Sequence, residues 1–274
     1  MKHSLLSLLV ILLVSMLACA IPGLEAPAPG LVDSNTLSTI VVSTANAAAS
    51  QTAAAQPSAA EIPSGTAVSK MTGTSIEQLQ NGTTRYTDYE AGFEVTVPAG
   101  WLAVRPGSDE FNTTLEKEGA HNQALHDDMT ADLGEYDANV DRLYSYVLRP
   151  DIGKNAVFGI SKLVWEAENK TTLDDATMGE MTRGLESSDG IPGFRADTAQ
   201  VRENGNAVKI IEIGGRFRLA DGQGGTTPLH ATIVFFKPTS RSLTRITFTM
   251  LLDYHDQIST DVRSMIESIK MVEQ

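Results

Sequence analysis

The chain has 274 residues, of which 34 are acidic and 21 basic, so its net charge is -13. This balance argues against a nucleic-acid-binding protein, whose surface would carry clustered lysine and arginine. The single cysteine excludes a disulfide scaffold and a multi-thiolate metal or iron–sulfur centre.

The first residues have the pattern of a secretory signal peptide. Lys2 precedes an apolar run over 5–17, which is shorter than the roughly 20 apolar residues of a transmembrane helix. Met16-Leu17-Ala18-Cys19 follows and resembles a bacterial lipobox, in which a small residue precedes a cysteine that is diacylated and becomes the mature N-terminus. We therefore expect a signal peptide over 1–18 and lipidation of Cys19. Ordinary secretion, with Ala18-Cys19-Ala20 as a cleavage site, is the alternative.

A tether is predicted over 19–83, because large apolar residues are almost absent after Val42 and alanine, serine and threonine dominate. Such a segment buries too little surface to offset the loss of chain entropy on folding. We expect a disordered stalk that holds a domain away from the membrane. A helical stalk is the competing interpretation, but Pro57 and Pro63 would end the helix.

Folding signals define a domain over 84–274. Strict alternation predicts a strand over Phe93–Val97, and after the turn at Pro98-Ala99-Gly100 a second strand begins at Trp101. The remaining apolar periodicities and turn residues predict a succession of helices and strands. These are a helix over 110–133, strands over 144–148 and 157–165, a helix over 173–187, strands over 194–202, 207–219, 229–237 and 242–252, and a closing helix over 256–271.

Runs of adjacent strands indicate an antiparallel sheet, and amphipathic helices must cover it. The predicted class is therefore α+β, with a sheet covered by about three helices and preceded by the tether.

Two segments resemble PsbP-like domains. Tyr89-Glu90-Ala91-Gly92-Phe93 with Pro98-Ala99-Gly100-Trp101 is similar to the opening of those domains, where it forms the first hairpin, and the terminal Ile266-Glu267-Ser268-Ile269 is similar to their ending. The resemblance implies an α-β-α sandwich around a curved antiparallel sheet. The founding members are non-enzymatic extrinsic subunits of photosynthetic complexes, and relatives are often lipoproteins. The matching residues are turn and core residues, so they transfer fold better than function.

No catalytic motif stands out. The sequence has no G-x-S-x-G elbow, and no local signature selects among His121, His126, His230 and His255. Asp137, Asn139 and Asp141 have the spacing that opens an EF-hand, but Arg142 and Leu148 stand where glycine and glutamate are required. These three residues are a candidate for a looser divalent-ion site, with a solvent-exposed linker as the alternative. We expect no cofactor.

The sequence thus predicts a non-enzymatic binding or assembly module that docks on a membrane or envelope protein complex. It would be held by acyl chains on Cys19 at the extracytoplasmic face of a bacterial cell membrane or outer membrane. The net charge favours a protein partner with a basic surface and salt-sensitive association. A receptor domain for a small ligand or divalent ion is the alternative, and it predicts a cleft with clustered polar side chains between sheet and helix.

Overall fold

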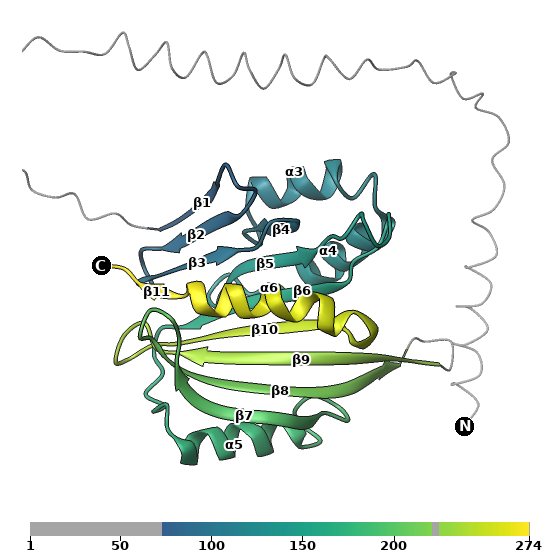
Figure 1. The fold of residues 1–274 in the computed structure, drawn as a ribbon. Coiled ribbons are helices and arrows are strands. Elements are labelled where there is room, and N and C mark those ends of the chain that lie inside the picture. Colours follow the sequence, from purple (N-terminus) through teal and green to yellow (C-terminus); the bar gives the residue numbers. More distant parts are fainter. Residues whose placement is uncertain (1–72, 221–224, 274) are drawn as a thin grey trace, which may run out of the picture. The chain divides into compact units, whose positions relative to one another are not determined.

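Two antiparallel sheets form the framework of the folded part of the chain (Figure 1). The computed structural model describes residues 73–220 and 225–273. The predicted signal peptide, Cys19 and the tether up to residue 72 lie outside the described residues. None of the described helices has the length and apolar character needed to cross a bilayer. Val68–Gln274 form one compact unit, and three clusters of buried apolar side chains, the hydrophobic cores, all lie within it.

The smaller sheet brings together the beginning and the end of the described chain. Its four strands, in spatial order, are β1 (Thr74–Gln78), β2 (Thr84–Asp88), β3 (Phe93–Val97) and β11 (Lys270–Met271). Phe93, Val95 and Val97 are fully buried, and the residues between them are half-buried. This is the alternation predicted for this strand.

The larger sheet has seven strands, and its order places the C-terminal meander beside the central hairpin. In spatial order these are β4 (Trp101–Val104), β5 (Asp141–Val147), β6 (Gly159–Glu166), β10 (Leu243–Leu251), β9 (Thr226–Phe236), β8 (Lys209–Ala220) and β7 (Arg195–Glu203). Every recorded strand pair is antiparallel, as predicted.

Helices cover both faces of the larger sheet. The described residues form α3 (Asp109–Lys117), α4 (Gln123–Glu135), α5 (Asp175–Glu186) and α6 (His255–Ser268), with a short 3-10 turn (Leu252–Tyr254) before α6. On one face, α3 and α4 pack on β4 and β5, and α5 packs on β7 to β9. On the other face, the smaller sheet and α6 enclose the main core. The layered α+β architecture expected from the sequence is therefore confirmed.

Three predictions about the first half of the domain were wrong. The strand at Trp101 does not form a hairpin with Phe93–Val97, because β3 pairs with β2 and β11 whereas β4 pairs with β5 in the other sheet. The single helix predicted over 110–133 is two helices, because Asn122 caps a new helix by accepting from the Leu125 amide. Folded structure also begins ten residues before residue 84, at β1, whose mostly polar residues gave no apolar alternation.

The closing helix has the predicted buried face but ends earlier than predicted. Ile258, Val262, Met265 and Ile266 are buried against the sheets. The backbone leaves the helix at Ile269, which is itself buried, and continues as β11 instead of remaining helical to residue 271. Pairing with β3 stabilises this extended end.

Candidate functional site

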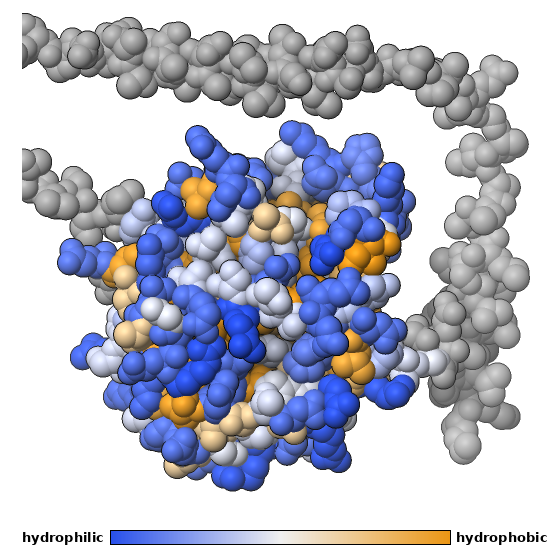
Figure 2. Space-filling view, in the orientation of Figure 1, coloured by the Kyte–Doolittle hydropathy of each residue, from blue (hydrophilic) through white to orange (hydrophobic). Residues whose placement is uncertain are grey.

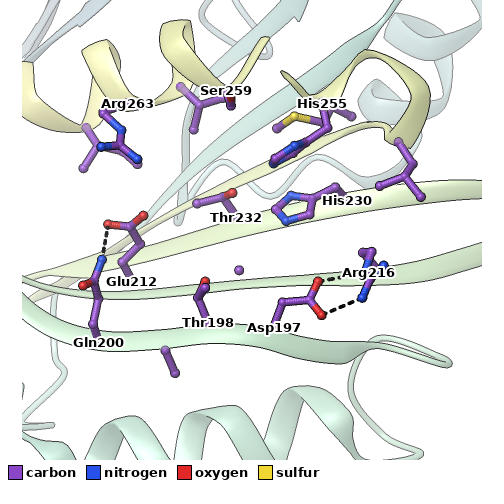
Figure 3. A pocket seen from close by; sticks show the side chains of 16 residues that line it. Asp197, Thr198, Gln200, Glu212, Arg216, His230, Thr232, His255, Ser259 and Arg263 are labelled. Carbon is purple, nitrogen blue, oxygen red and sulfur yellow. Dashed lines mark hydrogen bonds and ion pairs between the residues drawn. The ribbon is translucent and has the colours of Figure 1, made fainter. Parts of the chain in front are cut away.

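A groove of about 890 Å³ lies between α6 and the sheet surface formed by β7, β8 and β9. We call it the α6 groove. The sheet contributes polar and charged side chains, and α6 contributes both polar and apolar ones (Figure 3). Its lining residues are Asp197, Thr198, Ala199, Gln200, Glu212, Gly214, Arg216, His230, Thr232, Met250, Leu252, His255, Ser259, Val262, Arg263 and Ile266.

Strand alternation explains why the α6 groove lies where it does. On β8, Ile210 is part of the main core, and the next residues of the same face are Glu212, Gly214 and Arg216. On β9, Val234 belongs to the core, while the same face continues outward as Thr232 and His230. The α6 groove is thus the outer continuation of the core face, where the side chains change from apolar to polar.

Two histidines from different elements meet in the α6 groove. The rings of His230 on β9 and His255 at the start of α6 have centroids 4.1 Å apart and planes inclined at 50°. Burial, and next the charge of His255, lower the pKa of His230 to about 4. His230 is therefore neutral at physiological pH, and its buried Nδ1 has no hydrogen-bond partner among the described residues.

The carboxylates of the α6 groove are already paired with arginines. Arg216 donates through Nε and one terminal nitrogen to Asp197, at 2.8 and 2.9 Å, and these bonds lower the pKa of Asp197. Glu212 accepts from Arg202 at 2.8 Å.

Arg263, by contrast, makes no ion pair or hydrogen bond among the described residues, and it projects from α6 toward the sheet side chains (Figure 3). Among the described residues that line the α6 groove, Arg263 is therefore an unpaired cation.

The α6 groove presents hydroxyl, imidazole and guanidinium groups that can form hydrogen bonds with a ligand. Ser259, the hydroxyl nearest to the histidines along α6, donates to the Asp256 carbonyl and not to an imidazole. The two imidazole rings contact each other, and His255 Nδ1 lies 3.1 Å from a carboxylate oxygen of Asp256. Uncommitted groups such as Arg263 and Thr232 can instead bind an acidic or hydroxyl-bearing ligand.

The candidate ion site from the sequence lies elsewhere, in the turn between α4 and β5. The Asp137 carboxylate accepts from the amide and side chain of Asn139, and the Asp141 carboxylate accepts from the Asp137 amide. The turn is thus closed by its own hydrogen bonds. Nowhere in residues 73–220 and 225–273 do three or more His, Cys, Asp or Glu side chains come together as a metal site.

Of the four histidines considered from the sequence, two reach the α6 groove and two do not. His121 and His126 belong to the connection between α3 and α4 and to α4 itself, on the sheet face opposite α6. The sequence did not predict that His230, His255 and Asp197 lie together in one groove. The signal available in the sequence was the alternation in β8, where the residues of one face change from apolar Ile210 to charged Glu212 and Arg216.

The surface around α6 has no single broad apolar patch. Figure 2 shows this face as largely hydrophilic, with hydrophobic residues in small separate groups. Leu133, Leu219 and Met271 are the exposed large hydrophobic side chains among the described residues. The α6 groove is therefore a better candidate for a binding site on this face than the exposed apolar residues are.

Comparison with known proteins gives structural matches but no sequence match. No protein-family model matches the chain, and no curated protein matches it. The structure is similar to cyanobacterial PsbP from Synechocystis sp. PCC 6803, with a TM-score of 0.43 and 12% identity over 70% of this chain and 93% of that one.

Two further solved structures are similar at the same level. LpqN of Mycobacterium tuberculosis, described as involved in cell envelope biogenesis, has a TM-score of 0.40 and 10% identity over 73% of this chain and 90% of that one. A protein of Bacteroides thetaiotaomicron has a TM-score of 0.38 and 11% identity over 71% of this chain and 50% of that one. These likenesses concern the fold alone.

Proposed function

We propose that this protein is a non-enzymatic binding module, anchored by acyl chains on Cys19 to the extracytoplasmic face of a bacterial membrane, and that the α6 groove is its recognition site. The observation that carries the proposal is the mixed lining of the α6 groove. Polar side chains of three strands face a helix that presents Arg263 and Ser259, and the nearly buried Val262 and Ile266 also line the groove. A surface of this kind holds a partner segment by charge and by apolar contact together.

The occupant in the leading proposal is a segment of an envelope or membrane protein. The net charge of -13 favours a partner whose surface around the contact is basic. Such an association weakens as the salt concentration rises. Within the α6 groove, the paired carboxylates of Asp197 and Glu212 leave Arg263 to meet an acidic or carbonyl group of the partner.

A small-ligand receptor is the second candidate, and one observation favours it. The cleft with clustered polar side chains that a receptor requires is present between sheet and helix. His230 Nδ1, buried and without a partner among the described residues, is a hydrogen-bonding group that a bound polar molecule would satisfy. Under this alternative the ligand carries an acidic group for Arg263 and an apolar part for Val262.

Pull-down from solubilised membranes tests the leading proposal. The wild-type chain should capture a partner at low salt and release it at high salt, and Ser259→Arg should capture much less because the new side chain fills the α6 groove. Thr260→Arg is the matched control, since it adds the same charge one residue away at an exposed position that does not line the α6 groove. Equal capture by both variants would show that the partner binds elsewhere.

Thermal-shift screening separates the second candidate from the first. Small acidic metabolites and Ca²⁺ or Mn²⁺ are added to the wild-type chain and to Ser259→Arg. A rise in Tm that the variant loses supports a receptor. No rise for any compound, together with salt-sensitive protein capture, supports docking.

The anchor has its own test. Cys19→Ser should move the protein from the membrane fraction to the soluble fraction, because loss of the acyl chains removes about 0.8 kcal/mol for each buried methylene. An unchanged membrane fraction would refute lipid anchoring while leaving the α6 groove untouched.

A further inference from the structure

A second hollow, of about 810 Å³, lies away from the α6 groove, at the end of the domain where several connections meet. It is formed by the segment before α5, the β7–β8 turn, the β9–β10 turn and β11. Its lining includes Lys170, Lys209, Lys237 and Lys270. We call it the lysine pocket.

This concentration of positive charge is unusual for the chain that carries it. Four of its nine lysines surround one hollow, although acidic residues outnumber basic ones, 34 to 21. Among the described residues that line the lysine pocket, Asp174 is the one acidic side chain, and it is engaged as the N-cap of α5, accepting from the Thr177 amide.

The four lysine ammonium groups differ in the hydrogen bonds and ion pairs that they already make. Lys237 is fixed, because its Nζ donates to the carbonyls of Asn169 and Thr171 at 3.0 and 2.8 Å, which leaves a third proton. Lys270, whose side chain is exposed, forms an ion pair at 2.9 Å with the largely buried carboxylate of Glu94. Lys170 and Lys209 are exposed and make no ion pair or hydrogen bond among the described residues. The lysine pocket therefore has free positive charge beside an immobilised donor.

The lysine pocket lies at the end of the domain where the described chain begins. The Gly73 carbonyl accepts from the Tyr89 amide and the Gly92 carbonyl accepts from Val272, so the start of the described chain and the end of β11 both lie beside the β2–β3 turn. Figure 1 shows β11, the β7–β8 turn and the start of β1 at the same end of the domain. Met271, on the rim of the lysine pocket, is 38% exposed and places an apolar side chain there.

We infer that the lysine pocket binds the phosphate groups of anionic membrane lipids and turns this end of the domain toward the bilayer. Lysine is a flexible point charge suited to phosphate, and an exposed apolar residue beside basic ones suits the membrane interface. Lysines close to an anionic membrane each strengthen binding by roughly five-fold. The inference goes beyond the proposed function, because it concerns a different surface and does not depend on Cys19.

Vesicle co-sedimentation of residues 68–274, the compact unit that contains all three cores, tests the inference without the anchor. The vesicles contain phosphatidylcholine alone or phosphatidylcholine with phosphatidylglycerol. We expect binding to the anionic vesicles at low salt and much less to the neutral ones. Lys170→Gln with Lys209→Gln should weaken binding by roughly 25-fold. The matched control is Lys117→Gln with Lys154→Gln, which removes the same charge from exposed positions outside the lysine pocket.

Each outcome either supports or overturns the inference that the lysine pocket binds lipid phosphates. Loss of binding in the first pair of substitutions and retention in the second supports the inference. Equal loss in both pairs, or equal binding to neutral vesicles, overturns it. A rise in Tm with inorganic phosphate and no vesicle binding would also overturn it, because the lysine pocket would then serve free phosphate and not lipid. Unchanged Tm values of the substituted units show that the comparisons concern folded protein.

Discussion

Asn204, in the turn between β7 and β8, gives the sharpest test of how the α6 groove is held together. The residue is 6% exposed. Its side-chain nitrogen donates to the carbonyls of Ile266 and Ile269, at 3.0 and 2.8 Å, where α6 ends. Its oxygen accepts from the amides of Asn206 and Val208, at 3.0 and 2.9 Å. One amide therefore joins the outer strands of the larger sheet to the helix that closes the α6 groove.

The substitution Asn204→Asp keeps the shape and the two accepted bonds but removes both donors. A buried carboxylate oxygen then faces two carbonyl oxygens. Two lost hydrogen bonds account for about 0.5–1.5 kcal/mol each, and each buried group left unpaired adds about 1–3 kcal/mol. We expect a loss of about 3–5 kcal/mol at neutral pH, which for a domain of this size lowers Tm by roughly 10 °C.

Urea unfolding at pH 7 and at pH 4 measures the effect. The loss should be smaller at pH 4, because protonation of the new carboxyl restores one donor. Asn206→Asp is the control: its side chain donates to the Glu267 and Ile269 carbonyls of the same helix end, but it is exposed, so its substitution should cost less than about 1 kcal/mol. If Asn204→Asp costs no more than this control, Asn204 does not fasten α6 and the reasoning is refuted.

Three further predictions concern stability. The pKa of His230 is lowered to about 4 by burial, whereas an unfolded histidine titrates near 6.5, so the native state loses stability as pH falls from 6.5 to about 4. After allowance for partial solvent exposure, the loss of unfolding free energy is about 1–2 kcal/mol. In urea unfolding, the stability of His230→Gln should therefore change less with pH than that of the wild type. Parallel stability profiles of the two proteins would contradict this. Burial, and next the neighbouring carboxylates, raise the pKa of Asp128 to about 6 against an ordinary value of 3.8, so native stability is lost as pH rises between these values. Asp128→Asn should therefore be more stable than wild type by about 1–2 kcal/mol at pH 7 and equal to it at pH 3.5, and a gain that persists at pH 3.5 would exclude this cause. Gly215→Ala should lose about 1–3 kcal/mol in thermal unfolding, because its Cβ would lie 2.5 Å from the Phe194 ring. Gly184→Ala, whose Cβ meets nothing within 4 Å, should lose nothing.

Local sequence patterns predicted most of the helices and strands, because these elements depend on residues that are close in the sequence. The buried stripe of α6 and the alternation in β3 follow from periodicity, and both are confirmed. The pairing of strands does not follow from such patterns. Phe93–Val97 and Trp101 are separated by a short turn, yet they belong to different sheets, since their partners come from distant parts of the chain.

The two pockets could not be predicted for the same physical reason. His230 and His255 are separated along the sequence by the whole of β10, and the antiparallel return of that strand brings them together. The lysine pocket collects residues from three separate connections and from β11. Single lysines in turns are ordinary surface residues, and their meaning depends on the fold that gathers them.

The pairing of β11 with β3 determines when this domain can finish folding. Ser268 accepts from the Thr96 amide across 172 positions, and Lys270 and Met271 extend the contact as a two-residue strand. Contacts of such sequence separation form late, because a long loop must be closed before they give any stabilisation. The smaller sheet therefore lacks its last strand until residues 270 and 271 have emerged from the ribosome, and removal of β11 would leave the edge of β3 open.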